Sequence, residues 1–163
     1  MRLILISFIL SLLLIGCKDD SNPVVVPKEI PLETLLAAPE TLSVAGQNIF
    51  LTTELWRDFM PISPPDGKPL IAVVYISTTD STDISKEIDT DAIYVIKGND
   101  IWRAYLYYEE SPSYQNPPRR LIKVARDGPK WQTQILVDVV VNIIYQNQNY
   151  LLKAKDQFIH ETW

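Results

Sequence analysis

The chain holds one cysteine and one histidine among its 163 residues, and these two scarcities exclude whole classes of site. A single cysteine cannot form an internal disulfide, so the fold does not depend on a disulfide framework. Zinc sites draw mostly on His and Cys ligands, and nucleophilic triads use a histidine as general base. His160 lies close to the end of the sequence, where we expect an exposed edge position. The sequence gives no basis for zinc, and we expect no cofactor.

Basic residues are also in the minority, with 15 Lys and Arg against 20 Asp and Glu and a formal net charge of −5. Binding to nucleic acid through electrostatics requires a clustered basic face. The densest basic group consists of Arg119, Arg120, Lys123 and Arg126. We interpret this group as a solvated strand edge, because charged side chains at an edge block edge-to-edge pairing of sheets. We expect no nucleic-acid partner.

The long apolar run of the chain lies at its N-terminus. Arg2 precedes residues 3–15, which only Ser7 and Ser11 interrupt. A membrane-spanning helix needs about 20 apolar residues, so this run is too short to span. A basic start followed by a short apolar stretch is typical of a secretory signal peptide. The alternative is a short N-terminal membrane helix with an incidental cysteine at position 17.

The junction Leu14-Ile15-Gly16-Cys17 resembles the lipobox of bacterial lipoproteins. The resemblance covers only the first 20 residues. It implies that residues 1–16 are removed and that Cys17 is acylated on sulfur and then on nitrogen. More than one acyl chain makes a lipid anchor stable rather than transient. The resemblance therefore implies a protein tethered permanently to a membrane.

Residues 17–31 are polar and proline-punctuated, which predicts an extended tether that holds a domain away from the membrane. Lys18-Asp19-Asp20 resembles the surface-export signal of lipoproteins of the Bacteroidota. An ordinary charged linker is the alternative. In the sorting rule known for enterobacteria, aspartate directly after the cysteine retains a lipoprotein in the inner membrane. Lys18 stands there instead, which favours the outer membrane and, with the export signal, the cell surface.

Residues 32–163 have the size of one ordinary domain. Their pattern is period-2 and rich in Val, Ile, Tyr, Trp and Thr, which is typical of strands. The clearest strand alternates from Ile135 to Tyr145 and should form a hairpin with the segment from Tyr150 to Ile159. The predicted strands cover residues 41–44, 49–59, 70–77, 92–96, 101–108, 119–125, 134–145 and 150–159.

Seven to eight short strands with almost no helical periodicity predict an all-β fold. The layout resembles an antiparallel two-sheet sandwich of the immunoglobulin or fibronectin type, without the cysteine pair of antibody domains. A small β-barrel is the alternative. Long loops at residues 61–69, 78–90 and 111–118 favour the ends of a sandwich.

Acidic residues are numerous enough to raise two hypotheses about chemistry. Four carboxylates that could hold calcium at a loop tip are those of Asp80, Asp83, Asp89 and Asp91. Their spacing does not match an EF-hand loop, so a solvated acidic loop is the stronger interpretation. Paired acids for glycoside hydrolysis could come from Asp58 with Glu109 and Glu110.

Aromatic residues concentrate between residues 102 and 114. The alternation predicts that Tyr105 and Tyr107 share a face, and Tyr114 follows in the next loop. Exposed aromatic side chains stack on sugar rings and anchor interfaces, although aromatic residues also fill ordinary cross-strand pairs. These three tyrosines form the candidate binding face.

Two classes of function follow from these features. The first is a non-enzymatic, lipid-anchored module at the outer membrane that binds a protein or a glycan, or serves an envelope complex as an accessory subunit. The second is a small hydrolase of envelope polysaccharide that uses two carboxylates as acid and base.

Overall fold

The computed structural model describes residues 27–108 and 119–163, and this part of the chain is all-β apart from one short helix. In chain order the elements are α1 (Leu32–Leu36), β1 (Thr41–Val44), β2 (Gln47–Asp58), β3 (Leu70–Thr78), β4 (Asp89–Lys97), β5 (Asp100–Tyr105), β6 (Arg120–Gly128), β7 (Leu136–Tyr145) and β8 (Gln148–Thr162).

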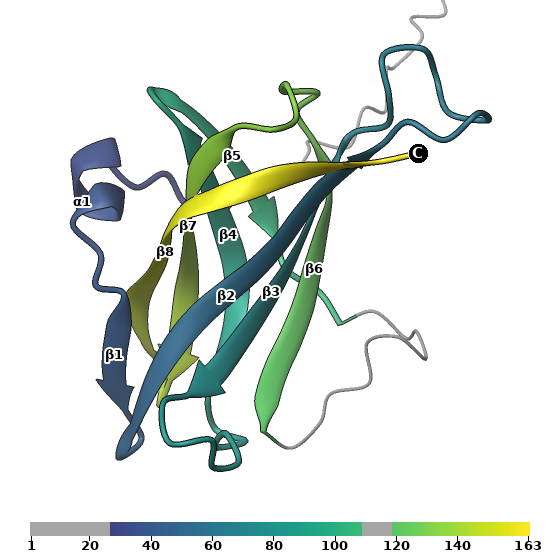
Figure 1. Ribbon diagram of the computed structural model, residues 1–163. Coiled ribbons are helices and arrows are strands. Elements are labelled where there is room, and N and C mark those ends of the chain that lie inside the picture. The colour runs from purple at the N-terminus through teal and green to yellow at the C-terminus, as the bar shows by residue number, and fades with distance from the viewer. Residues whose placement is uncertain (1–26, 109–118) are drawn as a thin grey trace, which may run out of the picture.

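The eight strands form one strongly curled sheet in the order β5-β4-β7-β8-β2-β3-β6, with β1 paired to β2. The sheet folds back on itself so that β4, β5 and β7 face β2, β3 and β6 (Figure 1). We call β4, β5 and β7 the β7 half, and β1, β2, β3 and β6 the β3 half. β8 belongs to both halves, because residues 148–158 pair with β7 and residues 159–162 pair with β2.

The predicted strands and hairpins are confirmed. β7 pairs antiparallel with β8, β4 with β5, and β1 with β2. The alternation of β7 is also confirmed, because Val137, Val139 and Val141 are buried on its inner face. Asp138 and Asn142 lie on the partly exposed outer face.

Three features differ from the sequence prediction. β2 and β8 run parallel over Leu55–Asp58 and Ile159–Thr162, so the sheet is mixed rather than antiparallel. β4 begins at Asp89, inside the predicted loop of residues 78–90. Helix α1 was not predicted, because five residues are too few to show a helical period.

The main core lies between the two halves of the sheet. It joins Ile49, Leu55 and Val74 of the β3 half to Ile93 and Val139 of the β7 half. All five side chains are at most 1% exposed. Burial of aliphatic surface of this kind is the dominant stabilising term in a domain of this size.

Residues 27–40, the N-terminal arm, cover the outer face of the β7 half. Leu35 of α1 is fully buried and packs with Tyr94, Ile96 and Val140 in a second cluster. Residues 27–31 also contact the sheet, so the contacts of the folded domain begin before residue 32, the predicted boundary. No helix in the described part of the chain is long and apolar enough to cross a membrane.

A buried arginine fixes the loop of residues 59–69. Arg57 is 4% exposed, and its guanidinium donates to the backbone carbonyls of Asp66, Lys68 and Trp131. Its guanidinium also lies 5.0 Å from the centre of the Phe59 ring. Three carbonyl acceptors on two loops hold this end of the molecule in one conformation.

Gly67 is a sensitive position in this loop, because its φ is +73° and an added Cβ would lie 2.6 Å from the Phe59 ring. We expect Gly67→Ala to lower the free energy of unfolding by about 3 kcal/mol through backbone strain and overpacking. Gly46→Ala is the matched control, since its φ is +72° with nothing within 4 Å of the added atom. It should lose only about 1 kcal/mol in the same urea titration. Equal losses would show that the Phe59 ring moves aside freely.

Candidate functional site

A groove runs between the N-terminal arm and the outer face of the β7 half. Its volume is about 400 Å³. We call it the Asn142 groove, after the residue at its centre. Its lining residues are Pro27, Lys28, Ile30 and Thr34 from the arm, and Asp91, Ala92, Tyr94, Tyr105, Asn142, Asn149, Tyr150 and Leu151 from the sheet.

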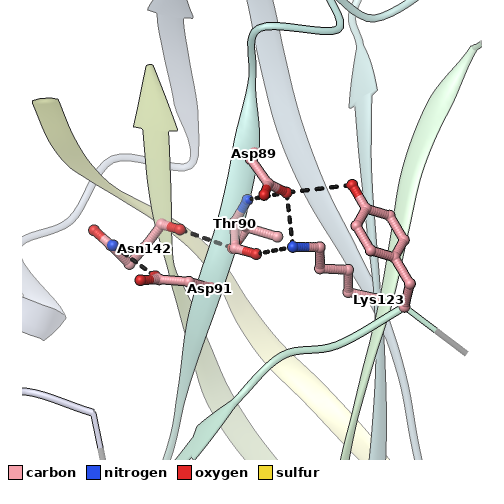
Figure 2. A network of polar contacts seen from close by, with 6 residues as sticks. Asp89, Thr90, Asp91, Lys123 and Asn142 are labelled. Carbon is pink, nitrogen blue, oxygen red and sulfur yellow. Dashed lines mark hydrogen bonds and ion pairs between the residues drawn. The ribbon is translucent and has the colours of Figure 1, made fainter. Parts of the chain in front are cut away.

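A row of polar side chains crosses three strands within the groove. Asn142 Nδ2 donates to Asp91 Oδ1 at 2.8 Å and to Asn149 Oδ1 at 2.9 Å. Figure 2 shows Asn142 and Asp91 pointing toward each other from β7 and β4. Within the described residues, Asn142 Oδ1 and Asn149 Nδ2 have no protein partner. The row therefore presents fixed acceptors and donors to the groove.

A register shift in β4 gives Asp91 its position. β4 and β7 pair regularly up to Thr90 and again from Ala92, with an irregularity between them. Thr90 is fully buried, and its hydroxyl donates to the Asn142 carbonyl at 2.7 Å. Bulges of this kind redirect one side chain of a strand, and here the redirected side chain is that of Asp91.

Tyrosine side chains also contribute to the groove. Tyr105 is 43% exposed and lines it. Tyr150 lines it as well, but its half-buried side chain packs against the main core on the inner face of the sheet. Tyr94 is buried, and its hydroxyl donates to the Lys28 carbonyl at 2.9 Å. Burial, and then the nearby charge of Asp91, raise the pKa of Tyr94, so its hydroxyl stays protonated as a donor at neutral pH.

The arm that forms the other wall of the groove is tied to the sheet by several bonds. Arg103 forms an ion pair with Glu29 at 2.8 Å. The Lys153 ammonium donates to the Leu36 carbonyl, and the Lys153 backbone amide donates to the Pro39 carbonyl at 2.8 Å. The groove is therefore preformed rather than dependent on a loose segment.

A buried lysine lies beneath the same part of β4 (Figure 2). Lys123 of β6 is 5% exposed, and its ammonium lies 2.7 Å from the Asp89 carboxylate and 2.5 Å from the Thr90 carbonyl. The ammonium also lies 4.4 Å from the centre of the Tyr108 ring. Burial, with help from Asp89, raises the pKa of Tyr108, which keeps this ring neutral over the lysine.

The burial of Lys123 shows that the prediction of a solvated strand edge for the basic group at residues 119–126 is wrong for this residue. β6 does lie at the end of the strand order, but Lys123 points inward on the same face as Leu121 and Ala125. The sequence carries no signal for this, because its partners Asp89 and Thr90 are more than thirty residues away.

The predicted tyrosines separate in the structure. Tyr105 lines the Asn142 groove. Tyr107 is 42% exposed, does not line the groove, and pairs through its backbone with Val124 of β6. Leu106 between them is buried, so the predicted alternation continues through Tyr107, although β5 itself ends at Tyr105. Tyr114 lies outside the described residues, as do Cys17, Lys18, Asp19 and Asp20.

The four aspartates of the calcium hypothesis do not form a cluster. Asp80 accepts from the backbone and hydroxyl of Thr82, which lower the pKa of Asp80. Asp89 pairs with Lys123, and Asp91 accepts from Asn142. In residues 27–108 and 119–163, no three His, Cys, Asp or Glu side chains lie close enough to hold a metal ion, Asp83 included.

Asp58, the described member of the acid pair, has a role in the loop. Its carboxylate accepts from the Met60 amide at 2.9 Å and pairs with Lys68 at 2.7 Å. The Lys68 contact is the main reason that the pKa of Asp58 is lowered, whereas a general acid needs a raised pKa. Glu109 and Glu110 lie outside the described residues. His160 is exposed and packs edge-on against Phe158.

Comparison with protein-family models, with curated proteins and with solved structures gives no match to this chain. The interpretation of the groove therefore depends on its own geometry.

The buried ion pair can be tested against a surface pair of the same length. Lys123–Asp89 and Lys130–Asp66 both measure 2.7 Å, but the lysine side chains are 6% and 39% exposed. We expect Lys123→Met to lower the free energy of unfolding by about 2 kcal/mol, because the Thr90 carbonyl loses its lysine donor. Lys130→Met should change it by less than ~1 kcal/mol. A similar small loss in both urea titrations would show that Lys123 is dispensable.

Proposed function

We propose that this protein is a non-enzymatic, lipid-anchored binding module of the outer membrane, and that the Asn142 groove binds a saccharide. The carrying observation is the fixed row of Asp91, Asn142 and Asn149 beside the exposed ring of Tyr105. The alternative of a protein ligand has less support, because protein-binding hot spots are typically more apolar than this row.

The chemistry of the groove suits a sugar ring. Sugar hydroxyls both donate and accept hydrogen bonds, and amide and carboxylate groups offer both functions at fixed positions. The flat faces of tyrosine rings pack against the C–H faces of a pyranose while their hydroxyls reach water. Lys28 and Asp91 are the ionisable groups of opposite charge that line the groove, which favours a neutral ligand over a strongly charged one.

The proposal of a lipid anchor rests on the resemblance of the sequence around Cys17 to a lipobox. The described domain begins at Pro27, ten residues after Cys17. A segment of that length spans at most about 35 Å when fully extended. Such a tether suits a module that works close to the membrane surface. Lys18-Asp19-Asp20 supports an outer-surface location by its resemblance to an export signal.

We also propose that the fold is a sandwich of the immunoglobulin and fibronectin type. In such sandwiches strands A, B and E share one sheet and strands G, F and C share the other, with C′ beside C in some members. The order β2-β3-β6 corresponds to A-B-E, and β8-β7-β4-β5 corresponds to G-F-C-C′. A closed barrel would need continuous pairing between β5 and β6, where the described residues contain one bridge, Tyr107 to Val124.

The saccharide hypothesis is tested on an array of bacterial envelope oligosaccharides and peptidoglycan fragments. We expect the protein to bind a member of the array, and Tyr105→Ala or Asn142→Ala to weaken that binding at least about tenfold. Tyr107→Ala is the matched control, since Tyr105 and Tyr107 are 43% and 42% exposed but only Tyr105 lines the groove. Equal weakening by both tyrosine variants, or no binding to any saccharide, would refute the groove assignment.

The anchor is tested by fractionation of the native host. The wild-type chain should sediment with membranes, and Cys17→Ser should appear in the soluble fraction because it has no acylation site. Protease treatment of intact cells should remove the wild-type domain, and Asp19→Ala with Asp20→Ala should protect it. A Cys17→Ser protein that stays in the membrane pellet would contradict the lipoprotein assignment.

A further inference from the structure

Three large apolar side chains project together into solvent at the end of the molecule opposite α1. Ile62 is 90% exposed, Trp163 is 77% exposed and Met60 is 48% exposed. We call these residues the apolar tip. The loop that carries Met60 and Ile62 extends beside the C-terminus of the chain (Figure 1). Phe59 connects the loop to the C-terminal residue, because the centre of the Phe59 ring lies 5.6 Å from that of the Trp163 ring.

The tip is held rigidly. The Phe59 amide donates to the Thr162 carbonyl at 2.9 Å, and the Ser63 amide donates to the Met60 carbonyl at 2.7 Å. Beneath them, Arg57 and Asp58 fix both ends of the loop. An exposed apolar group on a rigid support loses little conformational entropy when it binds. The exposure of Ile62 is therefore a property of an ordered surface.

Charges around the tip are paired with one another. Asp58 pairs with Lys68, and Asp66 pairs with Lys130, each at 2.7 Å. Both lysines are at least 39% exposed and could extend toward lipid phosphates. These two ion pairs carry no net charge, although the whole chain carries a formal charge of −5. Pairing of the charges weakens the repulsion that an acidic protein would meet at an anionic membrane.

Glu161 is the carboxylate close to Trp163 that has no cationic partner among the described residues. It accepts from Thr133 and Gln134 at 2.7 Å, and these bonds, with a contact to Trp163, lower its pKa. Transfer of an ionised carboxylate into the hydrocarbon of a bilayer costs a large free energy. The Glu161 carboxylate would therefore keep Trp163 at the level of the lipid headgroups, where tryptophan is enriched in membrane proteins.

We propose that the apolar tip inserts into the surface of the bilayer that carries the protein's own lipid anchor. The inference rests on the anchor given under the proposed function. Two or three side chains would not hold a free protein on a membrane. A tether of at most about 35 Å makes the contact effectively intramolecular, so a weak contact becomes populated.

Insertion of the tip gives the domain a defined orientation. α1 lies on the other side of the molecule from the loop of residues 59–69 (Figure 1). The residues that precede α1 line the Asn142 groove. A domain docked through its tip therefore holds α1, whose Thr34 lines one wall of the groove, away from the bilayer.

The experiment uses the mature chain, which begins at Cys17 and contains every described contact. Its only thiol, Cys17, is coupled to a maleimide phospholipid in vesicles, so the anchor exists whether or not cells acylate this residue. Vesicles are prepared with ordinary and with brominated acyl chains, which quench nearby tryptophans. The chain has four tryptophans, and the Trp163 emission is the difference between the wild type and Trp163→Phe.

We expect brominated vesicles to quench the Trp163 emission, and the double change Met60→Ser with Ile62→Ser to abolish that quenching. Leu36→Ser is the matched control, because Leu36 is an apolar side chain 41% exposed on α1, and it should leave the quenching unchanged. All substituted residues are exposed, so unchanged melting temperatures verify the fold. Equal Trp163 emission in both kinds of vesicle would overturn the proposal.

Discussion

The change of partner along β8 is the constraint on which the rest of the architecture depends. Its first part pairs with β7 as far as Phe158, and its last part pairs with β2 from Ile159 onward. The change follows Asp156, whose φ of +54° and backbone bond to the Asp138 carboxylate mark a bend in the strand. Because one continuous strand joins both halves of the sheet, the halves cannot separate without breaking β8. The core between them, the face under the N-terminal arm and the loop beside the C-terminus are all positioned by this strand.

On the opposite side of the core, the described residues contain no strand that joins the two halves, and a polar contact joins them there beside the Tyr107–Val124 bridge. Lys123 reaches from β6 to Asp89 and Thr90 of β4. Burying an ammonium group is costly unless it is paired and fully hydrogen-bonded, and here a carboxylate, a carbonyl and an aromatic ring share that role. Since Thr90 also bonds to the Asn142 carbonyl, the same contact holds the β4 irregularity that directs Asp91 into the groove. Lys123 thus links the stability of the domain to the geometry of the candidate site.

Most of the strand pattern was predictable, because a two-sided sheet imposes period-2 burial that a sequence displays directly. β7 is the clearest case, with alternate valines buried on the inner face. The parallel pairing of β2 with β8 was not predictable, since it joins segments about a hundred residues apart and leaves no local pattern. The burial of Lys123 was hidden for the same reason, because Asp89 and Thr90 are more than thirty residues away. Arg57 binds backbone carbonyls, which any residue type provides, so its burial leaves no residue pattern in the sequence.

The Asn142 groove was predictable only in part. Tyr105 drew attention as an aromatic residue on an outward face, and it does line the groove. Asp91 is one of the predicted calcium candidates, but its partner Asn142 lies within the apolar strand β7, where the sequence gives no sign of a site. The groove takes its side chains from several strands and from the N-terminal arm. Such residues are not separated by a regular spacing in the sequence, so no motif predicts the groove.

The two proposed surfaces depend on the same kind of hydrogen-bonded support. In the groove, Asn142 holds its neighbours by side-chain bonds, and at the tip, Arg57 holds a loop by bonds to backbone carbonyls. In both places a hydrogen-bonded support fixes exposed groups that would otherwise sample many conformations. The ordering entropy is then lost during folding rather than during binding. A small all-β domain with few polar residues in its core can in this way present a polar surface on its sheet and an apolar surface on a loop.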